Sequence, residues 1–310
     1  MSYMVKKNSL TAPKIHQIGK FNYFCIHMKE KFLKGILKGL ALFPLGILYL
    51  FSDVVSFVLY HIIKYRRKVV RKNLTDSFPA KTLKEIIAIE KDFYRYLGDQ
   101  IVETLKILHI SDKELSKRIT VSGYELINQS IEANKSSVVL MGHYGNWEWV
   151  QEISRYFTPE AFMASIYHPL NNKTWDNIFL KIRSRWSANI IPMKKAPRTL
   201  LDKSNSPWVC GFIADQWPHN RNHQNFIEFL NHKTWFIYGP EEIGNKLGAE
   251  YFYLEMNRLK RGHYEIIFHK LVPEDNSLPF PHTRIFWKEF EKTILRAPAF
   301  WLWSHKRWKS

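Results

Sequence analysis

The feature that most restricts the fold of this chain is an apolar stretch over residues 39–63, in which Asp53 is the only formally charged residue. A helix needs about 20 consecutive apolar residues to cross the hydrocarbon core of a bilayer. The stretch is long enough, but Asp53 near its middle and Pro44 near its start leave three membrane arrangements open: a kinked span, a re-entrant hairpin and an interfacial anchor. A buried core helix is the alternative that involves no membrane.

Basic residues flank this stretch on both sides. Cations at these places would lie at anionic lipid head groups, so the pattern favours a membrane-associated segment. The residues before it are polar, without the short apolar core of a secretory signal, and we expect no removed signal peptide. We predict a polar segment and membrane anchor over residues 1–65, followed by one large domain over residues 66–310. The flanking cations are Lys31, Lys34 and Lys38 on one side and Lys64, Arg66, Arg67, Lys68, Arg71 and Lys72 on the other.

The charge balance indicates a polyanionic neighbour. Lysine and arginine outnumber aspartate and glutamate by 46 to 28, a net charge of +18, and aromatic residues make up 15% of the chain. Such a mixture suits a membrane interface or a platform for single-stranded nucleic acid. The sequence has no zinc-finger spacing, basic zipper or RNA-binding signature, so we expect no nucleic-acid partner. Cys25 and Cys210 are the only cysteines and form neither a disulfide framework nor a metal cluster; both are expected to be buried.

Downstream of the apolar stretch, short β-branched or aromatic runs alternate with segments of helical periodicity. An amphipathic helix is predicted from Thr82 to about Leu108. The alternation predicts an α/β fold: a mixed β-sheet flanked by helices, preceded by the hydrophobic, membrane-associated helical segment. Strands are expected at residues 136–141, 162–167, 189–193, 208–214, 250–256 and 263–269, and further helices at 147–157, 175–186 and 240–247.

The block Gly142–Glu148 (GHYGNWE), which follows the first predicted strand, has the clearest chemical potential. Two side chains five residues apart on one helix would point about 140° apart. His143 and Glu148 therefore converge only if His143 lies in a turn and Glu148 lies in the first turn of the next helix, with Asn146 as its N-cap.

A carboxylate on one imidazole nitrogen makes the other nitrogen a better proton acceptor. We therefore predict His143 as a general base and Glu148 as its orienting partner. Because no serine is adjacent, the sequence favours a substrate alcohol that attacks an activated acyl group. A purely structural role for the histidine and the glutamate is the alternative.

The segment GHYGNWEW over residues 142–149 resembles the signature block of the bacterial lipid A biosynthesis acyltransferases of the lauroyl- or myristoyl-transferring type, within the lysophospholipid acyltransferase-like superfamily. The resemblance extends, in the same order, over most of the chain from about residue 66 onward. The other matching segments are Arg71–Leu74 with Phe78-Pro79, Tyr167-His168-Pro169 with Asn171-Asn172, Arg183 with Arg185, Asp215-Gln216, and Arg296–Pro298 with Trp303–Trp308.

The resemblance implies an enzyme that moves a fatty acyl chain from an acyl thioester, with acyl carrier protein as donor, to a hydroxyl of a lipid A precursor. His143 would be the base on that hydroxyl. Arg185, ahead of Arg183, would contact an anionic substrate group or developing negative charge, with a surface salt bridge as the alternative. Asp215 would be a supporting residue. Asn146, Tyr167 and His168 complete the predicted substrate-binding set; His168 stands where the family usually has arginine.

The implied partners are acyl carrier protein or another thioester donor, an anionic phosphorylated lipid acceptor and a membrane, with no cofactor and no metal. The implied location is the cell inner membrane, with the catalytic domain facing the cytoplasm. Two other functions stay open: the same chemistry on an aminolipid, glycerolipid or pigment precursor, and a catalytically silent membrane protein that binds lipid. The basic and aromatic run over residues 301–309 suits phosphate binding, a bilayer interface or a solvated terminal helix.

Overall fold

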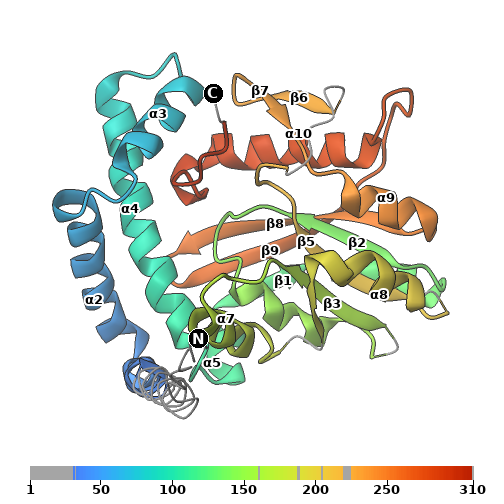
Figure 1. Ribbon diagram of the computed structural model, residues 1–310, viewed down its shortest axis with the longest axis horizontal. Coiled ribbons are helices and arrows are strands. Elements are labelled where there is room, and N and C mark those ends of the chain that lie inside the picture. Colours follow the sequence, from blue (N-terminus) through green and yellow to red (C-terminus); the bar gives the residue numbers. More distant parts are fainter. Residues whose placement is uncertain are drawn as a thin grey trace, which may run out of the picture.

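The computed structural model describes residues 31, 33–159, 161–186, 189–203, 205–218 and 225–308. The polar segment expected before residue 31, with Cys25, lies outside these residues. A mixed sheet forms the centre, helices α9 and α10 lie on one side of it, and helices α4 and α2 stand beside one end (Figure 1). The α/β prediction, with a mixed sheet flanked by helices, is therefore confirmed.

The central sheet has seven strands in the order β1-β9-β8-β2-β5-β3-β4. All neighbours pair in parallel except β8 and β9, which form an antiparallel hairpin. The six predicted strands are all present. The strands are β1 (Ile119–Ser122), β2 (Ser137–Met141), β3 (Phe162–Tyr167), β4 (Asn189–Pro192), β5 (Trp208–Ile213), β8 (Glu250–Lys260) and β9 (His263–Lys270), and a separate antiparallel pair is formed by β6 (Phe226–Phe229) and β7 (His232–Trp235).

The amphipathic helix predicted from residue 82 is α4 (Leu83–Lys106). It starts with a capping box, in which Thr82 and Glu85 each accept a hydrogen bond from the backbone of the other. The segment after the His143 turn is the short 3₁₀ helix η2 (Trp149–Tyr156), where an α-helix was expected. The other helices are α3 (Arg67–Ser77), α5 (Asp112–Ser116), α6 (Tyr124–Glu132), α7 (Lys173–Arg183), α8 (Ala196–Asp202), α9 (Gly239–Lys246) and α10 (Pro281–Arg296).

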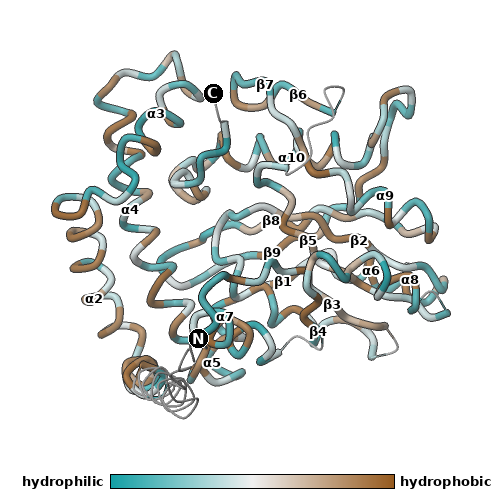
Figure 2. Tube along the Cα trace, viewed as in Figure 1, coloured by the Kyte–Doolittle hydropathy of each residue, from teal (hydrophilic) through white to brown (hydrophobic). Residues whose placement is uncertain are grey.

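The apolar stretch forms helix α2 (Leu45–Phe57), which continues into a π-helical turn, η1 (Val58–Ile62). Its hydrophobic composition is visible along the trace in Figure 2. Residues 45–62 are long and apolar enough to cross a membrane by length and composition. The helix packs along α4, as Figure 1 shows.

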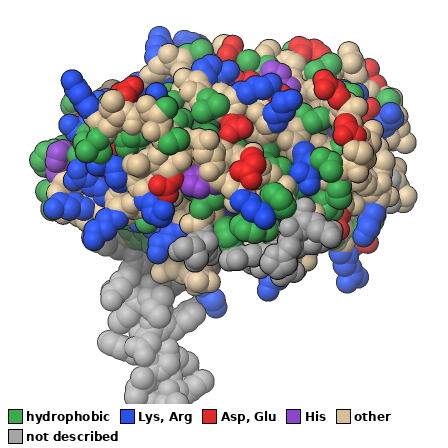
Figure 3. All heavy atoms as spheres, turned by 90° about the horizontal axis from the view of Figure 1, so that it is seen from above, with side chains coloured by type: hydrophobic (Ala, Val, Ile, Leu, Met, Phe, Trp, Pro, Cys, Tyr) green, Lys and Arg blue, Asp and Glu red, His purple; other side chains and the backbone are tan. Residues whose placement is uncertain are grey.

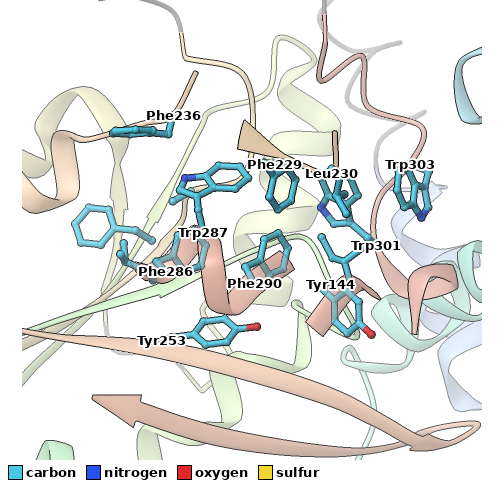
Figure 4. Packing of buried hydrophobic residues seen from close by; sticks show 14 of the residues in the cluster. Tyr144, Phe229, Leu230, Phe236, Tyr253, Phe286, Trp287, Phe290, Trp301 and Trp303 are labelled. Carbon is cyan, nitrogen blue, oxygen red and sulfur yellow. The ribbon is translucent and has the colours of Figure 1, made fainter. Parts of the chain in front are cut away.

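Buried side chains form two clusters, one on each face of the sheet, because successive strand residues point to opposite faces. One cluster is rich in aromatic rings from α10, β6 and the C-terminal segment, among them Phe229, Phe290, Trp301 and Trp303 (Figure 4). Trp301 and Trp303 are almost fully buried. The described part of the terminal run, residues 301–308, contains no helix and mixes buried residues with an exposed Lys306, so a solvated terminal helix is ruled out for it.

Candidate active site

The candidate site lies where the parallel strands β2 and β5 end. The backbone N–H of Ala214 donates to the carbonyl of Met141 at 2.9 Å, which holds the two strand ends side by side. His143 and Asp215 each follow one of these ends by two residues. Ligand sites of open α/β sheets lie at such carboxyl ends, so the topology brings both side chains to the expected edge.

The turn after β2 requires its two glycines. A Cβ at Gly142 would lie 2.1 Å from the ring of Phe290, and Gly145 has a φ of +59°, a conformation that residues with side chains rarely adopt. The N–H of Gly145 donates to the carbonyl of Phe300 at 3.0 Å. The C-terminal segment thus holds the turn in place from outside.

The carboxylate that contacts His143 is that of Asp215. Ring nitrogen Nδ1 of His143 lies 2.6 Å from Oδ1 of Asp215, and the backbone N–H of His143 donates to Oδ2 at 3.0 Å. The indole N–H of Trp301 donates to the same Oδ2 at 2.8 Å. Burial alone would raise the pKa of Asp215, but the charge and hydrogen bonds of His143 and the Trp301 hydrogen bond lower it to about 2.

An ionised Asp215 fixes a proton on Nδ1 of His143, which leaves the other ring nitrogen, Nε2, as a proton acceptor. The side-chain amide nitrogen of Gln216 lies 3.3 Å from Nε2. The hydrogen-bond partners of the His143 ring among the described residues include no serine or cysteine. This environment fits a histidine whose partner nucleophile arrives with a substrate.

Glu148 does not orient His143, contrary to our prediction. Its carboxylate instead accepts two hydrogen bonds from the guanidinium of Arg183, from Nε at 2.9 Å and from Nη2 at 2.6 Å. Residues 147 and 148 form a turn before η2 begins, so Glu148 is not in the helical turn from which it was expected to reach the imidazole. Asp215, which we ranked as a supporting residue, holds the position expected for Glu148.

The two arginines also lie differently from what we expected. Arg183 lines the cavity at the site, whereas Arg185 donates to the backbone carbonyls of Ile107 and Ile110 and does not line it. Helix α7 ends at Arg183, and the chain turns away over the next two residues. Burial alone would lower the pKa of Arg183, but its hydrogen bonds and ion pair with Glu148 raise it.

A cavity of about 630 Å³ adjoins these groups. Its volume lies within the range of roughly 300–1,000 Å³ that small-molecule sites occupy. Most of its wall is apolar, and both core clusters contribute, so it extends along both faces of the sheet near the strand ends. One face supplies Val139, Met141, Val150, Ile153, Met163 and Val209, and the other supplies Ala164, Ile166, Phe212, Phe236 and Ile243.

The remaining predicted residues divide into two groups. Tyr167 and His168, at the end of β3, line the cavity. Asn146 is fully buried outside the cavity wall and supports the turn: its amide nitrogen donates to Glu103 at 2.7 Å, and its amide oxygen accepts from the N–H of Trp149 at 3.2 Å. Asn146 therefore acts on the loop that carries His143 and makes no contact with the cavity.

Three residues that support the site in the structure were not among the predicted site residues. Gln216 lies beside His143, Trp301 contacts Asp215, and Glu103 anchors the turn from α4. Asp215-Gln216 follows a predicted strand, as His143 does. The carboxyl ends of parallel strands meet at one edge of a sheet, and this was the signal in the sequence that could have placed Gln216 near His143. The described residues contain no group of three or more His, Cys, Asp or Glu side chains placed to hold a metal ion.

Comparisons with known proteins relate most of this chain to the same family that its sequence motifs resemble. A family model described as "Bacterial lipid A biosynthesis acyltransferase" matches residues 23–310. The "Lipid A biosynthesis palmitoleoyltransferase" of Escherichia coli (strain K12) is 23% identical over 253 residues, which cover 80% of each chain. The "Lipid A biosynthesis acyltransferase" of Shigella flexneri matches with the same identity and coverage.

Proposed function

Because this chain belongs to the family of bacterial lipid A biosynthesis acyltransferases, and is therefore an acyltransferase, we propose that it transfers a fatty acyl chain from acyl carrier protein to a hydroxyl of a lipid A precursor. The observation that carries the proposal is the pair of His143 and Asp215 at the wall of a mainly apolar cavity. The cavity suits an acyl chain, and the pair suits removal of a hydroxyl proton.

In the proposed reaction, Nε2 of His143 takes the proton of the acceptor hydroxyl as its oxygen attacks the thioester carbonyl carbon. The new C–O bond forms a tetrahedral intermediate with negative charge on the former carbonyl oxygen. Collapse of the intermediate breaks the C–S bond, and the leaving thiolate takes the proton from His143. Asp215 is the positioning residue, since it keeps the Nδ1 proton in place and stabilises the imidazolium.

Arg183 is our candidate for stabilising the developing negative charge. Two of its N–H groups are engaged by Glu148, and the guanidinium lines the cavity that His143 also lines. A guanidinium has five N–H donors, so others remain for a substrate oxygen. Glu148 positions Arg183, while Tyr167, His168 and Gln216 are proposed to contact the substrates.

We place the catalytic unit in residues 66–310, anchored by the preceding segment to the cytoplasmic side of the inner membrane, where acyl carrier protein has access. The net charge of +18 supports this placement because the carrier, the phosphorylated acceptor and the leaflet are all anionic.

The decisive test is acyl transfer by the full chain in phospholipid vesicles, with acylated carrier protein as donor, a lipid A precursor as acceptor and product detection by mass spectrometry. His143→Ala is expected to abolish transfer, and His109→Ala, at an exposed position, is the matched control with native activity. Full activity of His143→Ala would overturn the mechanism. Transfer only to an aminolipid or glycerolipid offered in parallel would replace the acceptor and leave the mechanism intact.

A further inference from the structure

Helix α2 and its π-helical turn have two unlike faces. The face that packs on the protein contains buried leucine and serine, at residues 45, 48, 52 and 56. The opposite face, here called the outer face, is a continuous stripe of exposed apolar side chains at helical spacing. Its members are Ile47, Leu50, Phe51, Val54, Phe57 and Ile62, each between 41% and 67% exposed. Scattered single hydrophobic residues are normal on a protein surface, but a contiguous stripe of this length marks a contact site.

Polar contacts fix the inner face to α4 along most of its length. Lys106 donates to the carbonyl of Phe43 at 2.9 Å. Further along the antiparallel pair, Tyr49 donates to Glu103 at 2.9 Å and Ser52 donates to Asp99 at 2.6 Å.

The two helices also approach closely at Gly98. A Cβ at this glycine would lie 2.1 Å from the Oγ atom of Ser56, so α4 has no room for a larger residue there. Separating α2 from α4 would leave the buried acids of α4 without these partners, which is costly. The helix is therefore firmly attached to the domain that begins at residue 66.

This attachment is incompatible with a span across the bilayer. A helix of 18 residues is roughly 27 Å long and would need nearly all of its length to cross the hydrocarbon core. Helix α4 would have to enter with it, together with Arg261, whose guanidinium pairs with both Asp53 and Asp99 at 2.6 Å. Charged groups at the centre of a bilayer are costly, so this arrangement disfavours a span.

We propose that α2 and η1 lie in the plane of an anionic membrane surface, with the outer face among the lipid acyl chains and α4 on the protein side. The charges agree with this arrangement. Exposed cations lie at both ends of the helix, Lys31 and Lys38 before it and Lys64 and Lys68 after it. In Figure 3, Lys and Arg side chains gather beside hydrophobic ones at the left edge, the side on which Figure 1 shows α2 and α3. An in-plane amphipathic helix combines these two attractions.

The arrangement also sets the distance of the candidate site from the lipid. Glu103 of α4 accepts from Tyr49 of α2 and from Asn146 of the His143 turn, and Tyr96 of α4 donates to the carbonyl of Gly145 at 2.6 Å. Two helices, α2 and α4, each about 10 Å across, thus separate the outer face from the turn that carries His143.

The test is a depth measurement on the full chain with Cys25→Ser, in vesicles of phosphatidylethanolamine and phosphatidylglycerol. Cys210 stays, because it is fully buried. Spin labels are placed one at a time at residues 47, 54 and 62, and their accessibility to oxygen and to a water-soluble nickel complex is compared. An in-plane helix gives three similar, shallow depths. A deep label at residue 54 between two shallow ones would indicate a span or a hairpin and would overturn the proposal.

A binding experiment gives an independent readout that does not depend on acyl transfer. The double variant Leu50→Asp with Val54→Asp is expected to weaken flotation with the same vesicles by at least about tenfold. Leu278→Asp, at another exposed leucine before α10, is the control with native binding. Native vesicle binding by the double variant would contradict the proposal, as would a soluble dimer of the native chain that this variant dissociates.

Discussion

His143 and Asp215 lie 72 residues apart in sequence but are joined by two hydrogen-bonding contacts, one through the ring and one through the backbone. The backbone contact positions the carboxylate, and the ring contact sets the orientation and tautomer of the imidazole. We predict that Asp215→Asn lowers kcat by about 10³- to 10⁴-fold, because an amide does not hold the ring in the tautomer that a base requires. Steady-state kinetics on vesicles would measure this, and a loss of less than about tenfold would contradict the positioning role.

Glu148 and Arg183 are expected to act as one unit. Glu148→Gln and Arg183→Met should each lower activity, and the double variant should be no worse than the poorer single variant, since each single change already breaks the pair. A double-mutant cycle on kcat/KM measures this coupling. Glu148→Gln should also leave the pH profile of kcat unchanged. A shifted profile would instead support a role of Glu148 in orienting His143.

Asp215 should also make stability sensitive to acid. Its pKa is about 2 in the folded chain and near 3.8 when unfolded, so its stabilising effect is fully present above pH 4 and is lost as the pH falls towards 2. The lost free energy of unfolding is about 2 kcal/mol. Urea unfolding of the native chain and of Asp215→Asn at pH 6 and pH 3 would test this, with a smaller pH dependence expected for the variant.

Glu152 has the opposite pH dependence. Its carboxylate is almost fully buried and contacts the guanidinium of Arg155. Burial raises the pKa of Glu152 to about 7, so this group favours the folded chain at low pH and loses that effect as the pH rises to 7. Glu152→Gln is therefore expected to raise Tm at pH 8 and to leave it unchanged near pH 4. Equal Tm values of the native chain and Glu152→Gln at pH 8 would show that ionised Glu152 does not destabilise the fold.

The cavity wall should limit the length of the transferred chain. Val209 lies in β5 beside Met163, four residues before the end of the strand, and its side chain lines the cavity. Val209→Phe is expected to slow transfer of long acyl chains more than that of short ones. Its control is Cys210→Val, since this neighbouring side chain belongs to the other face and does not line the cavity. Competition between short- and long-chain donors would reveal the change as a shifted product ratio.

Periodicity predicted the six strands that carry the fold because each is a compact β-branched or aromatic run. Strand β1 has only four residues, and half of them are exposed, so it lacks that signal. Strands β6 and β7 form a small sheet of their own outside the alternating pattern.

The candidate site was predictable in its location and less so in its pairings. His143 and Arg183 were both named from the sequence and both line the cavity, but which carboxylate adjoins His143, that of Glu148 or that of Asp215, depends on which strands adjoin in the sheet. Spacing along the chain favoured the nearer carboxylate, whereas the parallel pairing of β2 with β5 placed the distant one against the imidazole. The position of Arg185 outside the cavity wall has a related reason, because α7 ends at Arg183 and the position of the helix end decides which arginine lines the cavity.

If the outer face of α2 lies in the membrane as proposed, the relevant concentration of the acceptor is its mole fraction among the lipids. A protein held flat on one leaflet meets a lipid by diffusion in two dimensions, so the mole fraction of acceptor in the membrane sets the rate of encounter. Inert phospholipid added at a constant amount of acceptor should slow the reaction by surface dilution, while added buffer should not. The carrier-bound donor that we propose would, by contrast, arrive from the aqueous volume. The enzyme would thus meet one substrate in the two-dimensional membrane and the other in three-dimensional solution.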